Sequence, residues 1–166
     1  MYHGTKSAEF ERFELGRTST NYSQLGSYQE KRLGIFFTPE KACAQEFAGT
    51  SGRLMTCHLC IKNPLDLRDG YPNMFYLKNR GLLYEQNIAN MLPYEMWELF
   101  DHGFPGAIEF VEQLKHDGYD GVKMIERDKD GYDVEVIVAL SSEQIWMSQT
   151  IDPTPPLTSS LAAGDV

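Results

Sequence analysis

Apolar residues gather in short runs along this chain, and their spacing changes from one segment to the next. The stretch "MYHGT" at 1–5 and the run "LGIFFT" at 33–38 each predict a short strand. A longer strand is predicted over 53–62, and it ends where Asn63-Pro64 interrupts the extended pattern. The first third of the chain is therefore expected to contribute several strands.

The segment "TPEKACAQEFA" at 38–48 has the residues of a helix start. We place Thr38 as the N-cap, Pro39 at the first helical position and Glu40 in the first turn. The alanines that follow favour a helix that continues to the end of this segment.

A second helix is predicted over about 105–116, where Ala107, Val111 and Leu114 fall on one face at helical spacing. Gly118 follows it, and a glycine there favours the left-handed conformation that ends many helices. This helix is expected to pack its apolar face on the core.

Two strands are predicted near the C-terminal end, "YDGVKMIER" at 119–127 and "DVEVIVAL" at 133–140. The turn "DKDGY" between them contains an Asp-Gly pair, a common β-hairpin signal. Glu135 interrupts the second strand beside three apolar residues, and a carboxylate removed from water needs a partner. The hairpin therefore raises the question of what pairs with Glu135.

The remaining segments give weaker patterns. The polar stretch 6–33 is expected to be loop with a short helix, and 72–101 is expected to form two helical pieces broken before Pro93. A single domain is predicted over 1–149, followed by a Pro/Ser-rich tail or linker at 150–166. Strands and helices do not alternate regularly, which favours an α+β fold.

Composition adds limits on function. The chain has 166 residues and a net charge of −9, from 15 basic and 24 acidic residues. That balance disfavours nucleic acid as the main partner, because proteins bind a phosphate backbone through clustered Lys and Arg side chains. The chain contains no apolar run of membrane-spanning length and no visible signal peptide. We therefore expect no membrane association, and a cytoplasmic location or delivery into a target-cell cytoplasm.

Cysteine usage points to a reducing compartment, because three cysteines do not make a disulfide framework. The "CHLC" at 57–60 looks like half a zinc site. It lies in a predicted strand, however, where residues three apart point to opposite faces. We therefore predict no metal site.

Three short stretches carry residues that suit chemistry: "YHGT" at 2–5, "GIFFT" at 34–38 and "EVIVAL" at 135–140. Each is weak alone. A single histidine is more often a surface residue, a Phe-Phe pair is usually core, and a strand-initial glutamate is usually solvated. Their order along the chain changes this view.

In that order the sequence resembles the ADP-ribosyltransferase superfamily, in its His-Tyr-Glu branch of diphtheria-toxin-like and poly(ADP-ribose) polymerase-like enzymes. It is most similar to the compact bacterial and phage domains of polyvalent and toxin-like proteins. The stretches that carry the resemblance are "YHGT", "GIFFTPEKACAQEFA", "IKNPLDL", "GYDGVKM" and "EVIVALSSEQI". The fold this implies is two small, mostly antiparallel sheets around an NAD cleft with flanking helices.

The resemblance implies an enzyme that cleaves NAD at the nicotinamide–ribose bond and transfers ADP-ribose. NAD is then a co-substrate, and no metal is needed. Glu135 would be the catalytic carboxylate, stabilising the ribosyl cation that forms as nicotinamide leaves. Its partner would then be the substrate.

The other site residues are implied in the same way. His3 would bind the adenosine-side ribose with support from Thr5, and Gly4 would offer its backbone to the nicotinamide carboxamide. A glycine suits that contact because a missing Cβ allows close approach. Phe36 stands where the family has its triad tyrosine, and Phe47 where an aromatic stacks on nicotinamide.

Departures from the family pattern leave alternatives open. Phe36 lacks the tyrosine hydroxyl, which puts the rate of turnover in doubt, and Ala44 stands where polymerases carry a serine. Asp133 either contacts the acceptor or is a plain hairpin carboxylate, and we favour the latter. Mono-ADP-ribosylation of a protein by a toxin, an effector or a phage-borne modifier is expected. The alternatives are a non-catalytic NAD- or ADP-ribose-binding module, and an enzyme whose acceptor is nucleic acid or water.

The histidine stretch begins at residue 2, with almost no chain before it. On that ground we expect a domain of a longer polypeptide.

Overall fold

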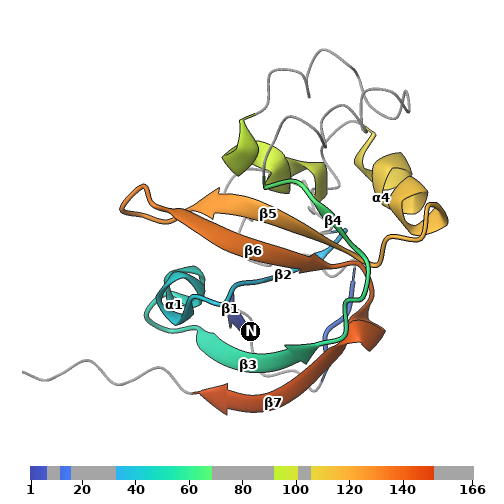
Figure 1. Ribbon diagram of the computed structural model, residues 1–166. Coiled ribbons are helices and arrows are strands. Elements are labelled where there is room, and N and C mark those ends of the chain that lie inside the picture. The colour runs from blue at the N-terminus through green and yellow to red at the C-terminus, as the bar shows by residue number, and fades with distance from the viewer. Residues whose placement is uncertain (7–11, 16–32, 69–91, 101–105, 152–166) are drawn as a thin grey trace, which may run out of the picture.

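The computed structural model describes residues 1–6, 12–15, 33–68, 92–100 and 106–151 (Figure 1). Its strands form two sheets. The three-stranded sheet has the order β1-β3-β7, from β1 (Tyr2–Thr5), β3 (Arg53–Leu59) and β7 (Ile145–Ile151). The four-stranded sheet has the order β2-β6-β5-β4, from β2 (Ile35–Phe37), β6 (Asp133–Ala139), β5 (Gly121–Arg127) and β4 (Pro64–Asp66).

All strand pairs are antiparallel except β4 with β5. The two sheets meet where Tyr2 and Thr38 exchange backbone hydrogen bonds of 2.8 and 3.0 Å. This contact places β1, which carries His3, directly beside the end of β2. The expected α+β fold with two mostly antiparallel sheets is confirmed.

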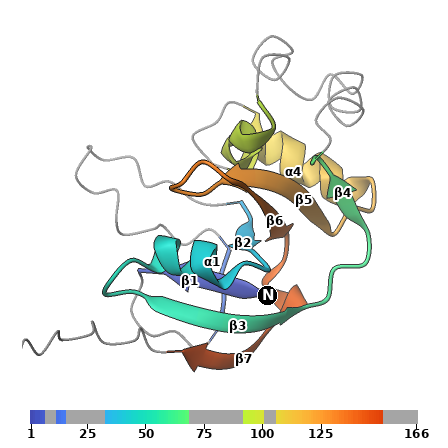
Figure 2. The ribbon, with the colours of Figure 1, turned by 60° about the vertical axis from the view of Figure 1, so that its left-hand side comes forward.

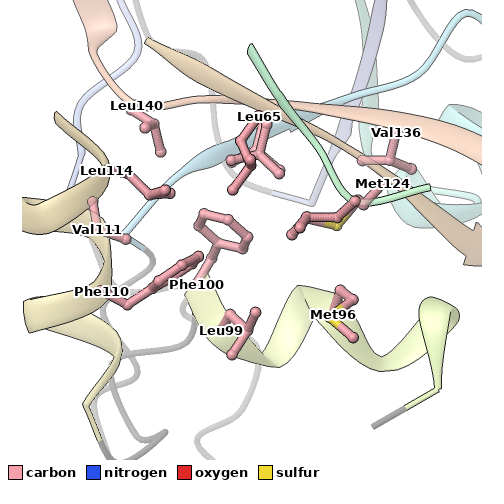
Figure 3. Packing of buried hydrophobic residues seen from close by; sticks show 13 residues of the cluster. Leu65, Met96, Leu99, Phe100, Phe110, Val111, Leu114, Met124, Val136 and Leu140 are labelled. Carbon is pink, nitrogen blue, oxygen red and sulfur yellow. The ribbon is translucent and has the colours of Figure 1, made fainter. Parts of the chain in front are cut away.

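One face of the four-stranded sheet is covered by helices. The 3₁₀ helix η2 (Pro93–Phe100) and the helix α4 (Ala107–His116) lie on it (Figure 1). Their apolar side chains meet those of β4, β5 and β6 in the larger core, where Phe100 packs against Phe110 with ring centroids 5.8 Å apart (Figure 3). Burial of these side chains is the main stabilising contribution on this side of the sheet.

The opposite face of the four-stranded sheet turns toward the three-stranded sheet. A second apolar cluster fills this space, formed by buried side chains of β2, β3 and β6 together with Phe13. The two faces follow from strand alternation, because successive residues of β6 point to opposite sides. Val134, Val136 and Val138 are buried toward the helices, so Glu135 and Ile137 point toward the other sheet.

The helix α1 (Lys41–Ala48) lies beside β1 in both ribbon views (Figures 1 and 2). It begins two residues later than expected. Glu40 occupies the N-cap position, and Thr38 instead accepts a 3.0 Å hydrogen bond from the backbone N–H of Glu40. The expected N-cap at Thr38 is therefore wrong, because its backbone is engaged in the bridge to Tyr2.

Two strands differ from the sequence expectation. The strand that begins at Arg53 ends at Leu59, and the residues after Asn63 form β4, which was not predicted. Pro64 is compatible with β4 because it is the first residue of an edge strand. The strand β7 was also not predicted, and it reaches Ile151, at the start of the expected tail.

Other expectations hold where the structure describes them. The hairpin of β5 and β6 is confirmed, and Gly118 after α4 has the left-handed φ of 87°. The 3₁₀ helix η3 (Ser142–Gln144) links β6 to β7. Most of 6–33 and 72–101, and all of 152–166, lie outside the described residues.

Candidate active site

Glu135 lies on β6, on the face of the four-stranded sheet that turns toward β1 and β3. Its side chain is 34% exposed. Phe37 shares this face, because its partner in the β2–β6 register is Ile137, two residues from Glu135. The carboxylate therefore lies on the face that turns toward the three-stranded sheet and not in the helix-covered core.

His3 lies on the same side of the sheet. Its ring packs on Phe37 with centroids 5.4 Å apart and meets Phe13 edge-on at 4.9 Å. Its Nδ1 is 2.8 Å from the carbonyl oxygen of Phe36. The structure thus brings His3 and Glu135, from the two ends of the chain, to one face of the four-stranded sheet.

The hydrogen bond of His3 fixes its tautomer. A carbonyl only accepts, so Nδ1 carries the proton and donates it to Phe36. Burial lowers the pKa of His3, and the bond to Phe36 only partly opposes this. The ring is therefore neutral at pH 7, with Nε2 as a hydrogen-bond acceptor.

The lowered pKa of His3 predicts an acid-sensitive fold. Below the unfolded pKa of about 6.5, His3 binds a proton in the unfolded chain but stays neutral in the folded chain. The free energy of unfolding therefore falls as pH drops. Between pH 7 and pH 5.5, the unaltered chain should lose more unfolding free energy than His3→Asn, by at most about 1 kcal/mol. Urea unfolding at both pH values measures this.

His58→Asn is the matched control for that comparison, because His58 is an exposed histidine on β3. The control should keep the pH dependence of the unaltered chain. If His3→Asn keeps it as well, then His3 is not the neutral group with a lowered pKa described above.

Phe36 points away from His3 and Glu135. It pairs with Val138 in the β2–β6 register, so both side chains lie on the helix-covered face. Its ring meets Phe100 edge-on, with centroids 6.1 Å apart. Phe36 thus offers its carbonyl to His3 while its side chain packs on the larger core, and Phe37 is the aromatic that contacts the histidine.

Gly4 packs against α1, the helix that carries Phe47. A Cβ on Gly4 would lie 1.7 Å from the carbonyl oxygen of Ala44, so the missing side chain lets α1 pack on β1. Phe47 lies on the same helix with its side chain 54% exposed, a surface on which a flat ring could stack. Thr5 lies two residues from His3, on the same side of β1.

The structure also supplies a protein partner for Glu135 that the sequence analysis missed. The Nη1 group of Arg68 donates to Oε2 of Glu135. Arg68 in turn binds both carboxylate oxygens of Asp66, with Nε–Oδ1 at 2.9 Å and Nη2–Oδ2 at 2.6 Å. The only sequence signal was a "DLR" triplet, in which Asp66 and Arg68 fall on one side of an extended segment.

Asp133 has a separate partner. Its side chain is exposed and lies 3.4 Å from Nε of Arg127, its register partner across the hairpin. Asp133 is thus engaged as a hairpin carboxylate.

The two buried cysteines do not add a reactive group. Burial raises the pKa of the Cys43 and Cys57 thiols to about 11, so both stay protonated at neutral pH. Cys60 lies beyond the end of β3.

Among the residues that the structure describes, no three His, Cys, Asp or Glu side chains are arranged to hold a metal ion. The described helices include none that is long and apolar enough to cross a membrane.

Two mostly antiparallel sheets, with helices packed beside them, are consistent with the ADP-ribosyltransferase class of folds. A family model described as "ADP-Ribosyltransferase in polyvalent proteins" matches residues 1–150. The chain therefore belongs to this family, whose members use NAD as the ADP-ribose donor. A search of curated proteins and a search of solved structures each found no match.

Proposed function

We propose that this chain is a mono-ADP-ribosyltransferase that cleaves the nicotinamide–ribose bond of NAD and transfers one ADP-ribose to a protein. The observation that supports the proposal is the common face of the four-stranded sheet on which Glu135 and the His3–Phe37 contact lie. Membership of the family adds the donor, NAD.

In this proposal Glu135 acts on the ribose of the nicotinamide side. The C1′–N bond breaks with its electron pair leaving on nicotinamide, and positive charge develops on the ribose ring. The ionised carboxylate accepts a hydrogen bond from a ribose hydroxyl and stabilises that charge through a short distance in a water-poor site. A nucleophile of the acceptor protein then attacks C1′ and releases its proton.

His3 is proposed to bind the adenosine-side ribose through Nε2. Because Nδ1 is committed to the carbonyl of Phe36, the neutral ring presents an acceptor that suits a ribose hydroxyl donor. Phe47 is proposed to stack on nicotinamide from the exposed side of α1. Gly4 and Thr5 are proposed to line the NAD site through β1, and Phe36 is proposed to take part through its backbone carbonyl, which orients His3.

The acceptor is proposed to be a protein because the chain is acidic. A net charge of −9 repels the phosphate backbone of DNA or RNA. A toxin, an effector or a phage-borne modifier acting in the cytoplasm of a target cell fits such an enzyme.

The test is transfer of label from NAD carrying radioactive phosphate, offered a protein extract, total RNA and duplex DNA in parallel. Label is expected in protein, as a discrete band, with an added mass of one ADP-ribose per site in mass spectrometry. Label in nucleic acid, or free ADP-ribose alone, would overturn the protein acceptor. NAD binding without nicotinamide release in every mixture would favour the non-catalytic module.

A further inference from the structure

The contact between Arg68 and Glu135 spans three strands. Asp66 on β4 pairs with Lys123 on β5, and Lys123 pairs with Ile137 on β6. Glu135 therefore lies two strand spacings from β4, about 10 Å away. A long arginine side chain crosses this distance over β5, whereas a short side chain on β4 would not.

The register explains why Arg68 is the residue that reaches Glu135. The chain of β4 runs parallel to β5, and β6 runs against both. Moving two residues on from Asp66 therefore leads in the direction that runs from Ile137 back to Glu135. Arg68 leaves the end of β4 level with the carboxylate.

Asp66 holds Arg68 in a fixed orientation. It accepts from Nε and Nη2 of the guanidinium, and its Oδ1 also accepts a 3.1 Å hydrogen bond from the backbone N–H of Arg68. Such a two-pronged contact fixes the plane of a guanidinium in a way that a single bond does not. Arg68 binds Asp66 through the Nε and Nη2 edge of its guanidinium, and it binds Glu135 through Nη1.

The same arrangement engages one of the two carboxylate oxygens of Glu135. Arg68 binds Oε2, and within the described residues no hydrogen bond to Oε1 is formed. The hydrogen bonds from Arg68 lower the pKa of Asp66. Lys123, the register partner of Asp66 on β5, lowers that pKa further. Glu135 is thus held by one bond through Oε2. Its other oxygen, Oε1, and part of its negative charge are left to interact with a substrate.

We propose that Asp66 and Arg68 are positioning residues for NAD cleavage: Asp66 fixes Arg68, and Arg68 orients the carboxylate of Glu135 toward the ribose. This inference rests on the proposed function. The other explanation is an ordinary surface ion pair, since the three side chains are 34–41% exposed. Exposed pairs contribute little to stability, so substitutions here should leave the fold intact and affect the reaction alone.

The first test is steady-state nicotinamide release by Arg68→Gln, with a protein extract as acceptor. We expect kcat to fall by roughly 10- to 100-fold and KM for NAD to change by less than about threefold, because the carboxylate is misoriented while NAD contacts remain. Arg127→Gln is the matched control, since Arg127 also pairs with an aspartate on this hairpin. It should keep the activity of the unaltered chain.

Four further variants separate positioning from a general loss of structure. The double variant Arg68→Gln/Glu135→Gln should be no slower than Glu135→Gln, because Arg68 acts only through that carboxylate. Millimolar guanidinium ion should restore part of the rate to Arg68→Ala and should leave unchanged the rate of Arg127→Ala, which is expected to equal that of the unaltered chain. Arg68→Lys should not recover the rate of the unaltered chain, because an ammonium lacks the two edges needed to bridge Asp66 and Glu135.

Failure of the proposed function and failure of this inference would give different experimental results. No nicotinamide release by the unaltered chain, with acceptor present, would overturn the proposed function and this inference with it. Release by the unaltered chain that Arg68→Gln leaves within twofold would overturn the inference alone. A large rise in KM with kcat unchanged would also overturn it, because Arg68 would then bind NAD directly.

Discussion

Replacing Glu135 by glutamine is expected to lower nicotinamide release from NAD by about 100- to 1,000-fold. Glutamine has the same shape and still accepts a hydrogen bond, but it removes the negative charge that would stabilise the ribosyl cation. KM for NAD should change little, since one hydrogen bond to the ribose survives. Release is followed by chromatography of nicotinamide, with and without a protein extract as acceptor.

The matched control for this substitution is Glu112→Gln. Glu112 is exposed on α4, the helix that covers the opposite face of the four-stranded sheet. It removes the same charge from the same chain at a distance from the candidate site, so its activity should equal that of the unaltered chain. Equal activity of Glu135→Gln and Glu112→Gln would contradict the electrostatic role of Glu135.

Local patterns were enough to predict the segments that contain the candidate site. The Asp-Gly turn marked the hairpin of β5 and β6, and the placement of Glu135 in a run of β-branched residues marked it as unusual. The motif order along the chain pointed to the family that the match over residues 1–150 shows. These signals lie within short segments or in the order of motifs along the chain, so they can be read from the sequence alone.

The partner of Glu135 could not be predicted, because it depends on strand pairing across the sheet. Arg68 and Glu135 are 67 residues apart in the chain, and only the parallel pairing of β4 with β5 makes them neighbours. The same limit applies to the two adjacent phenylalanines of β2. One of them must face His3 and the other the helices, and the register with Ile137 and Val138 decides which.

The strand β7 was missed for a different reason. Its inward residues, Ile145 and Met147, alternate with Trp146 and Ser148. Trp146 is exposed although it is apolar, which hides the period of two. Its pairing with β3 also shifts register between Thr56 and Cys57. A bulged strand with an exposed aromatic gives a weak sequence signal.

Gly4→Ala is expected to be the most destabilising of these substitutions, by about 3 kcal/mol. The added Cβ would lie 1.7 Å from the carbonyl oxygen of Ala44 and 2.9 Å from the backbone nitrogen of Ala48. Both are backbone atoms of α1, so no side chain can move aside, and the helix itself must shift away from β1. Urea unfolding of the variant beside the unaltered chain measures the loss.

Gly118→Ala provides the control, because a Cβ there meets nothing within 4 Å and only its φ of 87° is unfavourable. It should cost about 1 kcal/mol, the penalty for a left-handed alanine. The comparison separates two explanations for Gly4. If Gly4→Ala unfolds at much lower urea, the glycine is required by the contact of α1 with β1, which aligns His3 beside β2. If Gly4→Ala keeps its stability and loses only NAD affinity, the missing Cβ serves the ligand, and the helix must be able to yield.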